Sequence, residues 1–353
     1  MRALFLVLHR KDRSPGQRYR HEQYLNYLQE NGIECTISPL LATEKEDGIF
    51  YGNKVIPKIW IGLKALFRRF NSIRRAHTFD VVYIYRDAFF FGTFFENWLR
   101  RKKIKIIYDF DDAIWLMDQN PNQGIFNKLK NPKKTASICK IADRVIVGNE
   151  YLANYASKFN EDVAIIPSTI NFDDYQFDKI TNDKICIGWT GSFSTIKHFE
   201  TVIPALEMLK EKYQDKIYFK VIGDPQYTHD ALGIKGIKWQ SETEAQDLSE
   251  LAIGLMPLPD NEWTRGKCAM KGLQYMALGI PTIMSPVGVN ADIISDGNNG
   301  YLASSTDEWV EKLSILIEDQ VLREKVGKAG KKTVEEAYSV EANKEKWLRA
   351  FQF

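Results

Sequence analysis

The sequence predicts an α/β protein with two domains, each an open parallel sheet flanked by helices. Strand-like and helix-like segments alternate along both halves of the chain, which is typical of parallel sheets covered by helices. A segment without periodicity, residues 171–184, separates the halves. The length of 353 residues also exceeds what one ordinary hydrophobic core requires.

We therefore assign residues 1–170 to a first domain, 171–184 to a linker and 185–338 to a second domain, followed by a final helix within 339–353. Open parallel sheets bind ligands at the carboxyl ends of their strands. We expect the two carboxyl edges to face each other across a cleft that holds the ligands.

Apolar runs predict strands and helical periodicity predicts helices in each half. In the first half we expect strands at 3–8, 35–41, 81–85, 105–109, 144–147 and 163–166, and helices at 19–28, 55–75, 89–99, 134–141 and from 150. A charged loop is expected between 41 and 55. In the second half we expect strands at 185–189, 218–222, 237–239, 254–257 and 280–283, and helices at 198–211, 246–252, 264–278, 307–317, 321–337 and 340–351.

The composition is that of a soluble globular protein, with 44% hydrophobic and 27% charged residues. A net charge of +2 gives no overall attraction to nucleic acid. The four cysteines lack disulfide or metal-ligand spacing, which favours a reducing compartment. The amino-terminal apolar run lacks the layout of a signal peptide, and no run approaches the ~18 residues of a spanning helix. We therefore expect a cytoplasmic protein.

The segment from 264 to 290 combines a helical pattern, a stop at Gly279, a short strand and a glycine-bearing loop. On a helix, Lys267, Lys271 and Gln274 would share one narrow face. The opposite face would be apolar and the loop would carry Gly288 at the strand's carboxyl end. The alternative interpretation is an ordinary amphipathic helix with solvated lysines.

The string Gly266-Lys-Cys-Ala-Met-Lys-Gly-Leu-Gln-Tyr-Met-Ala277 resembles the signature of retaining, nucleotide-sugar-dependent glycosyltransferases of family 4. That family usually has two glutamates here; Gly266 and Gln274 take their places, so the string is more similar to a variant branch with Gly-Lys-Cys-x-x-Lys-x-x-Gln-Tyr-Met-Ala. The resemblance implies the GT-B architecture of two Rossmann-like domains, with the last helix returning to the first domain. It implies transfer of a sugar from a nucleotide-diphosphate sugar to a hydroxyl with anomeric retention.

Gly191 and Ser192 follow the first strand of the second half, where glycine lets a backbone approach a phosphate. The resemblance implies that Lys197 grips the donor diphosphate and that Ser192 replaces the usual Arg. Lys267 or Lys271 is then expected to supply the missing cation. A tight turn without ligand is the alternative for Gly191.

Three further residues are donor-binding candidates through the resemblance. Gly288 corresponds to the glycine-rich loop, and Asp292 replaces a longer Glu that contacts the sugar or ribose. Asp292 as a helix cap or turn residue is an equal alternative. Gln274 can still hydrogen-bond ribose hydroxyls as a neutral amide.

An acidic string, Asp109-Phe-Asp-Asp112, follows a predicted buried strand. Carboxylates there suit metal binding, general-base work or hydroxyl recognition, and turn chemistry with a helix cap is the alternative. The variant branch has this string, so we expect Asp111 or Asp112 to contact the acceptor or sugar and count both, with Lys197, as catalytic candidates. The usual mechanism on this fold needs no metal, and we predict no metal or other cofactor.

Residues 14–20 follow the first strand, where the resemblance implies a loop near the diphosphate and acceptor. Gly16 permits close approach of the backbone. Arg18, Arg20 and, more weakly, Arg86 could bind a phosphorylated acceptor, because guanidinium pairs with phosphate. Solvated arginines are the alternative.

Residues 58–75 predict a basic amphipathic helix whose apolar residues include Ile59, Leu63 and Phe67. The favoured interpretation is that this face packs on the sheet while the basic face is solvated. This helix and the basic run 100–103 together make an anionic membrane at the inner face of the cell a candidate partner. A lipid-linked acceptor would explain such binding.

The sequence thus predicts a hexosyltransferase-like enzyme that acts in cell-surface polysaccharide or glycan assembly. Its partners would be a nucleotide-sugar donor and a glycan or lipid-linked acceptor, not nucleic acid. A nucleotide-sugar epimerase or a glycan phosphorylase on the same fold is one alternative. A non-catalytic glycosyltransferase-like partner protein is another, suggested by Ser192, Gly266 and Gln274 in place of charged residues.

Overall fold

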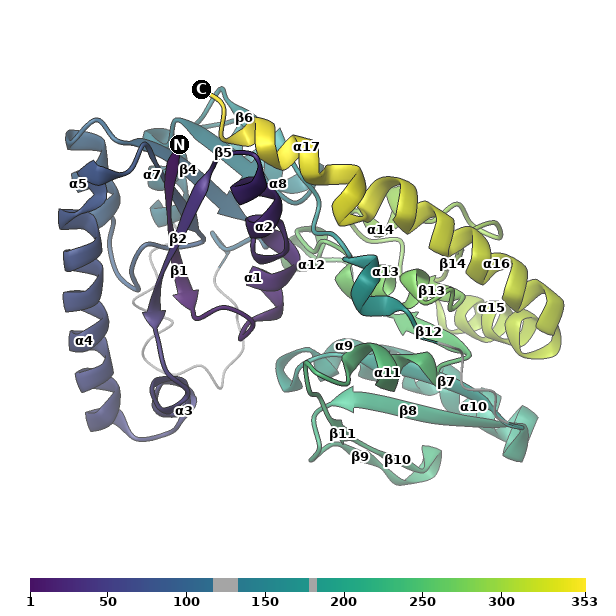
Figure 1. Cartoon of the computed structure of the whole chain (residues 1–353). Coiled ribbons are helices and arrows are strands. Elements are labelled where there is room, and N and C mark those ends of the chain that lie inside the picture. Colours follow the sequence, from purple (N-terminus) through teal and green to yellow (C-terminus); the bar gives the residue numbers. More distant parts are fainter. Residues whose placement is uncertain (117–132, 178–182) are drawn as a thin grey trace. The chain divides into compact units, whose positions relative to one another are not determined.

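The computed structural model describes residues 1–116, 133–177 and 183–353, so residues 178–182 of the predicted linker lie outside it. The chain divides into two compact units (Figure 1). Unit 1 contains Met1–Ser168 and Asn343–Phe353, and unit 2 contains Thr169–Ala342. Each unit has a six-stranded parallel sheet with flanking helices, which confirms the predicted fold class.

The sheet of unit 1 has the strand order β2-β1-β3-β4-β5-β6, with every neighbouring pair parallel. Its strands are β1 (Arg2–His9), β2 (Glu34–Leu41), β3 (Val81–Tyr85), β4 (Lys105–Phe110), β5 (Arg144–Val147) and β6 (Val163–Ile165). These strands are mostly buried apolar runs, as expected where helices cover both faces. The chain moves to one side of β1 for β2 and to the other for β3, so a topological switch point lies between β1 and β3.

The described helices of unit 1 are α1 (Pro15–Arg20), α2 (Leu25–Glu30), α3 (Glu44–Tyr51), α4 (Val55–Arg74), α5 (Phe94–Arg101), α7 (Lys133–Ile141), α8 (Glu150–Ala156) and most of α17 (Val340–Ala350). α4 packs on β2, and α5 and α7 pack on β4. In α17, Trp347 stacks on Tyr24 with ring centroids 4.9 Å apart. The charged loop expected after β2 is in fact helix α3, and the helix expected at 19–28 is split by a 3-10 turn at Glu22–Tyr24.

The favoured prediction for the basic helix, now α4, is wrong. Its predicted apolar face is largely exposed: Ile59 is 57% and Phe67 74% exposed. The helix packs through a different face that includes Ile61, Ala65 and Arg69, all buried. Arg69 is fully buried because its guanidinium donates to three backbone carbonyl oxygens, those of Val7, Ser38 and Ala88, at 2.5–3.0 Å.

The sheet of unit 2 has the order β11-β8-β7-β12-β13-β14, again parallel throughout. Its strands are β7 (Ile185–Thr190), β8 (Ile217–Gly223), β11 (Ile237–Lys238), β12 (Ile253–Met256), β13 (Thr282–Met284) and β14 (Tyr301–Leu302). A small antiparallel pair, β9 (Thr228–His229) and β10 (Ile234–Lys235), stands apart from this sheet. The switch point of unit 2 lies between β7 and β12.

The helices of unit 2 are α9 (Ile196–Phe199), α10 (Ile203–Tyr213), α11 (Glu244–Ser249), α12 (Glu262–Arg265), α13 (Met270–Ala277), α14 (Asn290–Ile293), α15 (Thr306–Glu318) and α16 (Gln320–Thr333). α10 packs on α15, and α13 packs on β12, β13 and α16. The core between these layers includes the buried side chains of Trp189, Leu206, Leu255 and Leu313. Among the described residues, no helix of either unit has the length and hydrophobicity to cross a lipid bilayer.

Candidate functional site

Unit 1 carries a polar cluster at the carboxyl edge of its sheet. Arg86 follows β3, and its guanidinium donates hydrogen bonds to Asp111 at 2.7 Å and to Asp112 at 2.6 Å. The Tyr85 hydroxyl also donates to Asp111, at 2.8 Å. A Cβ added to Gly16 would stand 2.6 Å from the Tyr85 hydroxyl oxygen and 3.6 Å from an Asp111 oxygen. The fold thus brings together four residues that the sequence singled out: Gly16, Arg86, Asp111 and Asp112.

The charges of this cluster are partly open to solvent. The Arg86 side chain is 36% exposed, and those of Asp111 and Asp112 are 12% and 16% exposed. Burial disfavours the charged form of Arg86, but the Asp111 carboxylate opposes it and the pKa of Arg86 lies well above its ordinary value. Carboxylates that accept hydrogen bonds from hydroxyls, beside a permanent cation, suit recognition of a polyhydroxylated or anionic molecule.

Arg20 was predicted to bind the acceptor, but it lies in the core of unit 1. Its side chain is fully buried and forms an ion pair with the equally buried Asp109, with nitrogen–oxygen distances of 2.6 and 3.2 Å. It also donates to the carbonyl oxygen of Ile166. This burial does not fit acceptor binding, so we assign Arg20 to the core. Arg18 is half-buried instead, and donates to the Tyr19 hydroxyl at 2.5 Å.

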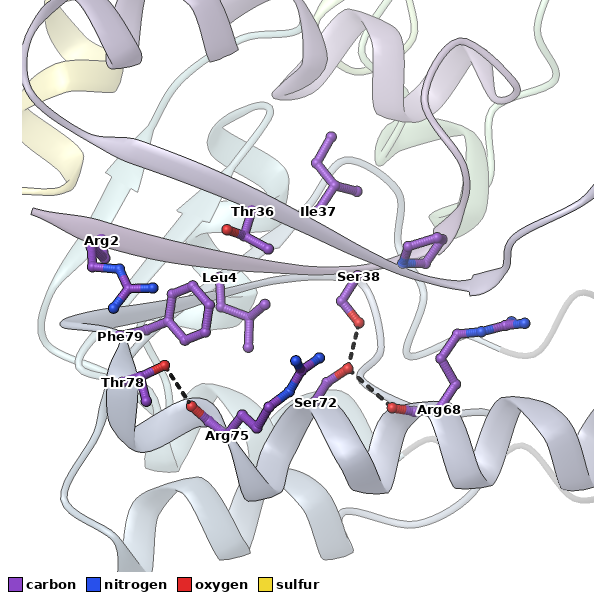
Figure 2. A pocket seen from close by; sticks show the side chains of 11 residues that line it. Arg2, Leu4, Thr36, Ile37, Ser38, Arg68, Ser72, Arg75, Thr78 and Phe79 are labelled. Atoms are coloured by element: carbon purple, nitrogen blue, oxygen red, sulfur yellow. Dashed lines mark hydrogen bonds between the residues drawn. The ribbon is translucent and has the colours of Figure 1, made fainter.

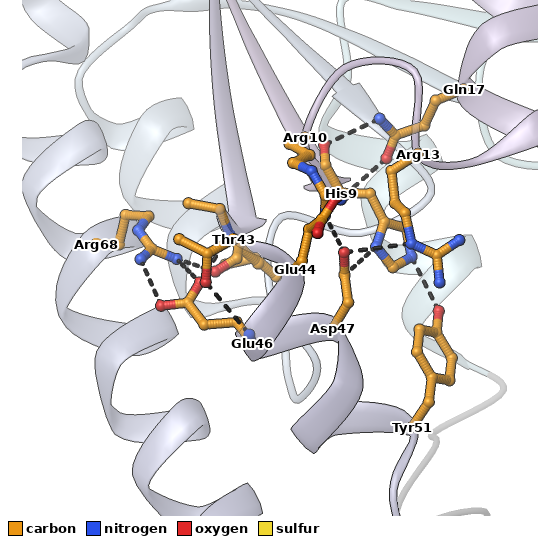
Figure 3. A network of polar contacts seen from close by, with 12 residues as sticks. His9, Arg10, Arg13, Gln17, Thr43, Glu44, Glu46, Asp47, Tyr51 and Arg68 are labelled. Carbon is orange, nitrogen blue, oxygen red and sulfur yellow. Dashed lines mark hydrogen bonds and ion pairs between the residues drawn. The ribbon is translucent and has the colours of Figure 1, made fainter.

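A second polar cluster at the carboxyl end of β1 was missed by the sequence analysis (Figure 3). The His9 imidazole lies between Asp47, 3.1 Å from Nδ1, and the Tyr51 hydroxyl, 2.9 Å from Nε2. Arg10 and Arg13 also bind the Asp47 carboxylate. Asp47 and Tyr51 belong to α3, the helix that was expected to be a loop, so nothing in the sequence pattern placed them beside His9.

Burial shifts the pKa of two groups in the second cluster, and α1 joins this cluster to the first. Burial lowers the pKa of His9, against the opposing effect of Asp47. Burial raises the pKa of the Tyr51 phenol, and both Arg13 and Arg86 oppose that rise. Gln17 of α1 donates its amide N–H to the His9 carbonyl oxygen at 3.0 Å, and the preceding residue, Gly16, lies beside Tyr85 and Asp111. The start of α1 therefore contacts both clusters.

A cavity of about 420 Å³ opens between β2 and α4, away from this edge (Figure 2). Its lining includes Arg2 at the amino end of β1 and Arg75 just after α4. The Ser38 and Ser72 hydroxyls at its wall hydrogen-bond each other at 2.7 Å. Because its lining includes Arg2 and Phe79, near the amino ends of β1 and β3, we do not count it as part of the candidate site.

In unit 2, Gly191 and Lys271 meet at the switch point. Gly191 follows β7 directly, and its N–H donates to the carbonyl oxygen of Ile222 in β8 at 2.9 Å. A Cβ on Gly191 would lie 2.7 Å from Cε of Lys271 and 2.5 Å from the Trp189 ring. The Lys271 ammonium stands 5.6 Å from the centroid of that ring. The backbone of Gly191, which has no side chain to cover it, therefore lies beside the half-buried ammonium group of Lys271.

The predicted helical face of Lys267, Lys271 and Gln274 is wrong in its first member. The helix is interrupted, because α12 ends at Arg265 and Ala269 takes the left-handed conformation at φ 55° before α13 begins. Lys267 lies in the connecting turn, with its ammonium 4.9 Å from the centroid of the Trp263 ring. Lys271 stands in the first turn of α13.

Gln274 and its neighbour Tyr275 are buried and hold parts of unit 2 together. The Gln274 amide nitrogen donates to the Tyr175 hydroxyl at 2.9 Å. The Tyr275 hydroxyl accepts a hydrogen bond from the backbone N–H of Thr190 at 2.8 Å, and so fixes the end of β7. The polar face predicted for this helix is thus partly internal.

The remaining donor candidates fall at two kinds of position. Gly288 has φ 55°, and a Cβ there would lie 2.5 Å from the carbonyl oxygen of Arg265, so its loop packs against the end of α12. Ser192, Lys197 and Asp292 are exposed. Lys197 lies on α9 and Asp292 on α14, two separate short helices.

The described parts of the chain contain no group of three or more His, Cys, Asp and Glu side chains that could hold a metal ion. The four cysteines are all free thiols. Burial raises the pKa of Cys35, Cys139 and Cys186 to about 12 in each case, so these thiols are poor nucleophiles and metal ligands. The chemistry of the site therefore rests on carboxylates, lysines, arginines and backbone groups.

Part of the chain matches a known family. Residues 172–333, most of unit 2, match the family model described as glycosyl transferases group 1. The match contains both the Gly191–Lys271 contact and the Gly288 loop. It supports a glycosyltransferase that uses a nucleotide-sugar donor. A search of curated proteins finds no significant match to the chain.

Comparison with solved structures extends over the whole chain. A sucrose-phosphate synthase from Thermosynechococcus elongatus is similar with a TM-score of 0.72 at 14% identity, covering 99% of this chain and 98% of that one. HepE from Anabaena, in complex with UDP-glucose, has a TM-score of 0.63 at 12% identity, covering 99% and 98%. A UDP-N-acetylglucosamine 2-epimerase-like protein from Listeria monocytogenes has 0.59 at 11%, covering 99% and 95%. The fold is therefore GT-B, with two Rossmann-like domains.

Proposed function

We propose that this chain transfers a sugar from a nucleotide-diphosphate sugar to a hydroxyl acceptor. The observation that carries the proposal is the contact of Gly191 with Lys271 at the switch point of unit 2, inside the matched segment. A diphosphate needs a backbone that it can approach closely and a cation beside it. The complex of HepE with UDP-glucose adds support, since that protein shares this fold.

In this proposal Lys271 and Lys267 neutralise the charge that develops on the departing diphosphate, which is the largest electrostatic effect such a site can supply. The Gly191 and Gly288 loops bring backbone groups toward the donor. Lys197, Ser192 and Asp292 contact the donor from their exposed positions. Gln274 receives a supporting role, because its amide already bonds Tyr175.

Unit 1 supplies the acceptor side. Asp111 and Asp112, oriented by Arg86, would hold acceptor hydroxyls, and Arg18 would be an additional anion contact. We propose anomeric retention and membership of the variant branch of family 4 on the strength of the sequence string from Gly266 to Ala277. We name no covalent nucleophile and no metal. The acceptor would be a glycan or a lipid-linked glycan in cell-surface polysaccharide assembly, and the enzyme would work in the cytoplasm.

An epimerase remains a second candidate because one similar structure is described as such. The discriminating observation is conversion of the nucleotide sugar without an acceptor. A non-catalytic partner protein would bind a nucleotide sugar and neither transfer nor hydrolyse it across a panel of acceptors.

The test is a thermal-shift panel of UDP-, GDP-, ADP- and dTDP-sugars. A ligand at one hundred times its dissociation constant stabilises a protein by about 2.7 kcal/mol, so the matching donor should raise the melting temperature in a concentration-dependent way. If no nucleotide sugar shifts the folded protein at millimolar concentration, the proposal fails.

A further inference from the structure

α4 exposes an apolar stripe along most of its length. Eight large apolar side chains are 42–74% exposed there: Val55, Ile56, Ile59, Trp60, Leu63, Leu66, Phe67 and Phe70. They recur at the three- and four-residue spacing that puts side chains on one side of a helix. A contiguous apolar patch of this kind on a water-soluble fold marks a surface that contacts something else.

The neighbouring helix α5 continues this patch. The ring of Phe70 lies 5.2 Å from that of Trp98, which lies 5.9 Å from Phe94. Phe94 is 65% exposed, and Phe91, just before α5, is 45% exposed. We call the exposed apolar residues of α4 with Phe91 and Phe94 the α4–α5 surface.

The exposed charges on α4 and α5 are all positive, and one of them, Arg100, lies 3.3 Å from Asp143. α4 contains no Asp or Glu in its twenty residues, but it contains Lys58, Lys64 and Arg74 outside its packed face. Lys54 precedes it, and the basic run at residues 100–103 ends α5. The Lys102 ammonium lies 5.2 Å from the centroid of the Trp98 ring, at the junction of apolar and basic residues.

We propose that the α4–α5 surface docks unit 1 on an anionic lipid bilayer, with the apolar side chains in the headgroup region and the cations among lipid phosphates. This combination of an apolar face, aromatic residues and basic neighbours is that of helices that lie in a membrane interface. A second copy of the chain fits less well, because a symmetric contact would bring these like charges together. The inference goes beyond the proposed sugar transfer and does not depend on it.

The experiment is flotation of the full chain with vesicles of phosphatidylcholine alone and of phosphatidylcholine with phosphatidylglycerol. Leu63→Asp/Phe67→Asp tests the apolar contribution, and Lys64→Gln/Arg74→Gln tests the charges. The matched controls lie in α16 of unit 2: Val321→Asp, at an apolar residue 78% exposed, and Lys325→Gln/Lys328→Gln. All changed residues are exposed, and circular dichroism verifies that each variant is folded.

Wild type and both controls should float with the anionic vesicles and stay in solution with the neutral ones. The apolar variant should lose more than about tenfold in lipid affinity, and the charge variant about fivefold for each cation removed. Wild type that never floats overturns the proposal, and so does equal flotation of the α4 variants and their controls. A concentration-dependent dimer in sedimentation velocity that Leu63→Asp/Phe67→Asp dissolves would assign the surface to self-association instead.

Discussion

Cε of Lys271 lies 2.7 Å from the point that a Cβ on Gly191 would occupy. The aliphatic part of the Lys271 side chain therefore passes the end of β7 so closely that any residue other than glycine at position 191 would collide with it. The Trp189 ring closes the other side of the same space, 2.5 Å from that point. The position of the Lys271 side chain therefore depends on the absence of a side chain at Gly191. These two residues are the two parts of the proposed diphosphate site.

Gly191→Ala should damage this site. The new methyl group would overlap Trp189, which is buried and cannot move away, so we expect a loss of about 1–3 kcal/mol in the free energy of unfolding of unit 2. It would also push Lys271 aside and weaken nucleotide binding. Gly62→Ala in α4 is the control. Among the described residues, no atom outside the adjacent backbone of α4 lies within 4 Å of its Cβ position, and the change should stabilise the helix by about 0.5–1 kcal/mol. Chemical denaturation measures both, and equal stability of Gly191→Ala and wild type would contradict this packing.

The buried pair of Arg20 and Asp109 yields a stability prediction. Asp109→Asn should lower the free energy of unfolding of unit 1 by about 3–5 kcal/mol, because it leaves a buried guanidinium without its carboxylate. Replacing both partners, as Arg20→Met/Asp109→Leu, should cost much less than Asp109→Asn alone. Denaturant titrations of the three proteins measure this. If Arg20→Met/Asp109→Leu is no more stable than Asp109→Asn, the uncompensated charge of Arg20 is not the cause of the loss in stability.

His21 predicts a pH dependence of stability. It is fully buried among Phe5, Tyr83 and Tyr85, and burial followed by the nearby Arg20 lowers its pKa to about 3. Its Nε2 has no hydrogen-bond partner among the residues that the structure describes. Between pH 3 and its ordinary value near 6.5, the unfolded chain binds a proton that the folded chain does not. Above pH 6.5 the titration of His21 therefore does not lower the free energy of unfolding. Below pH 6.5 it lowers the free energy of unfolding by about 1.4 kcal/mol for each pH unit.

The measurement is the free energy of unfolding from pH 7 to pH 5, where His21 should account for a loss of about 2 kcal/mol. His21→Phe keeps the aromatic contacts and removes the titrating group, so its stability should fall less over this range. An identical pH profile for wild type and His21→Phe would refute the buried, neutral state of the imidazole.

Much of the fold could be predicted from the sequence, because parallel strands buried on both faces are continuous apolar runs. The prediction failed where side chains behave against their usual preference. α4 has two stripes, and its more apolar one faces outward while Arg69 is buried against three carbonyl oxygens. A helical wheel shows both stripes but contains nothing that says which one the sheet covers.

The site was predictable only where a short string fixes local geometry. Gly16, Asp111 and Arg86 follow strands, so parallel topology brings them to one edge. The break in the helix before Met270 was not predictable, because Ala favours helices and Ala269 adopts φ 55° only under tertiary packing. The contact of His9 with Asp47 was not predictable either. It depends on where α3 packs, and the spacing of apolar residues in the sequence does not indicate that position.

Isothermal titration of UDP and other nucleoside diphosphates into wild type, Lys271→Ala and the control Lys325→Ala tests directly whether Lys271 binds a diphosphate. We expect one diphosphate to bind wild type and the control equally. Lys271→Ala should weaken this binding by about tenfold or more, since a hydrogen bond to a charged group contributes about 1.5–3 kcal/mol. Unchanged binding by folded Lys271→Ala, or no binding of any diphosphate by wild type, would contradict this expectation.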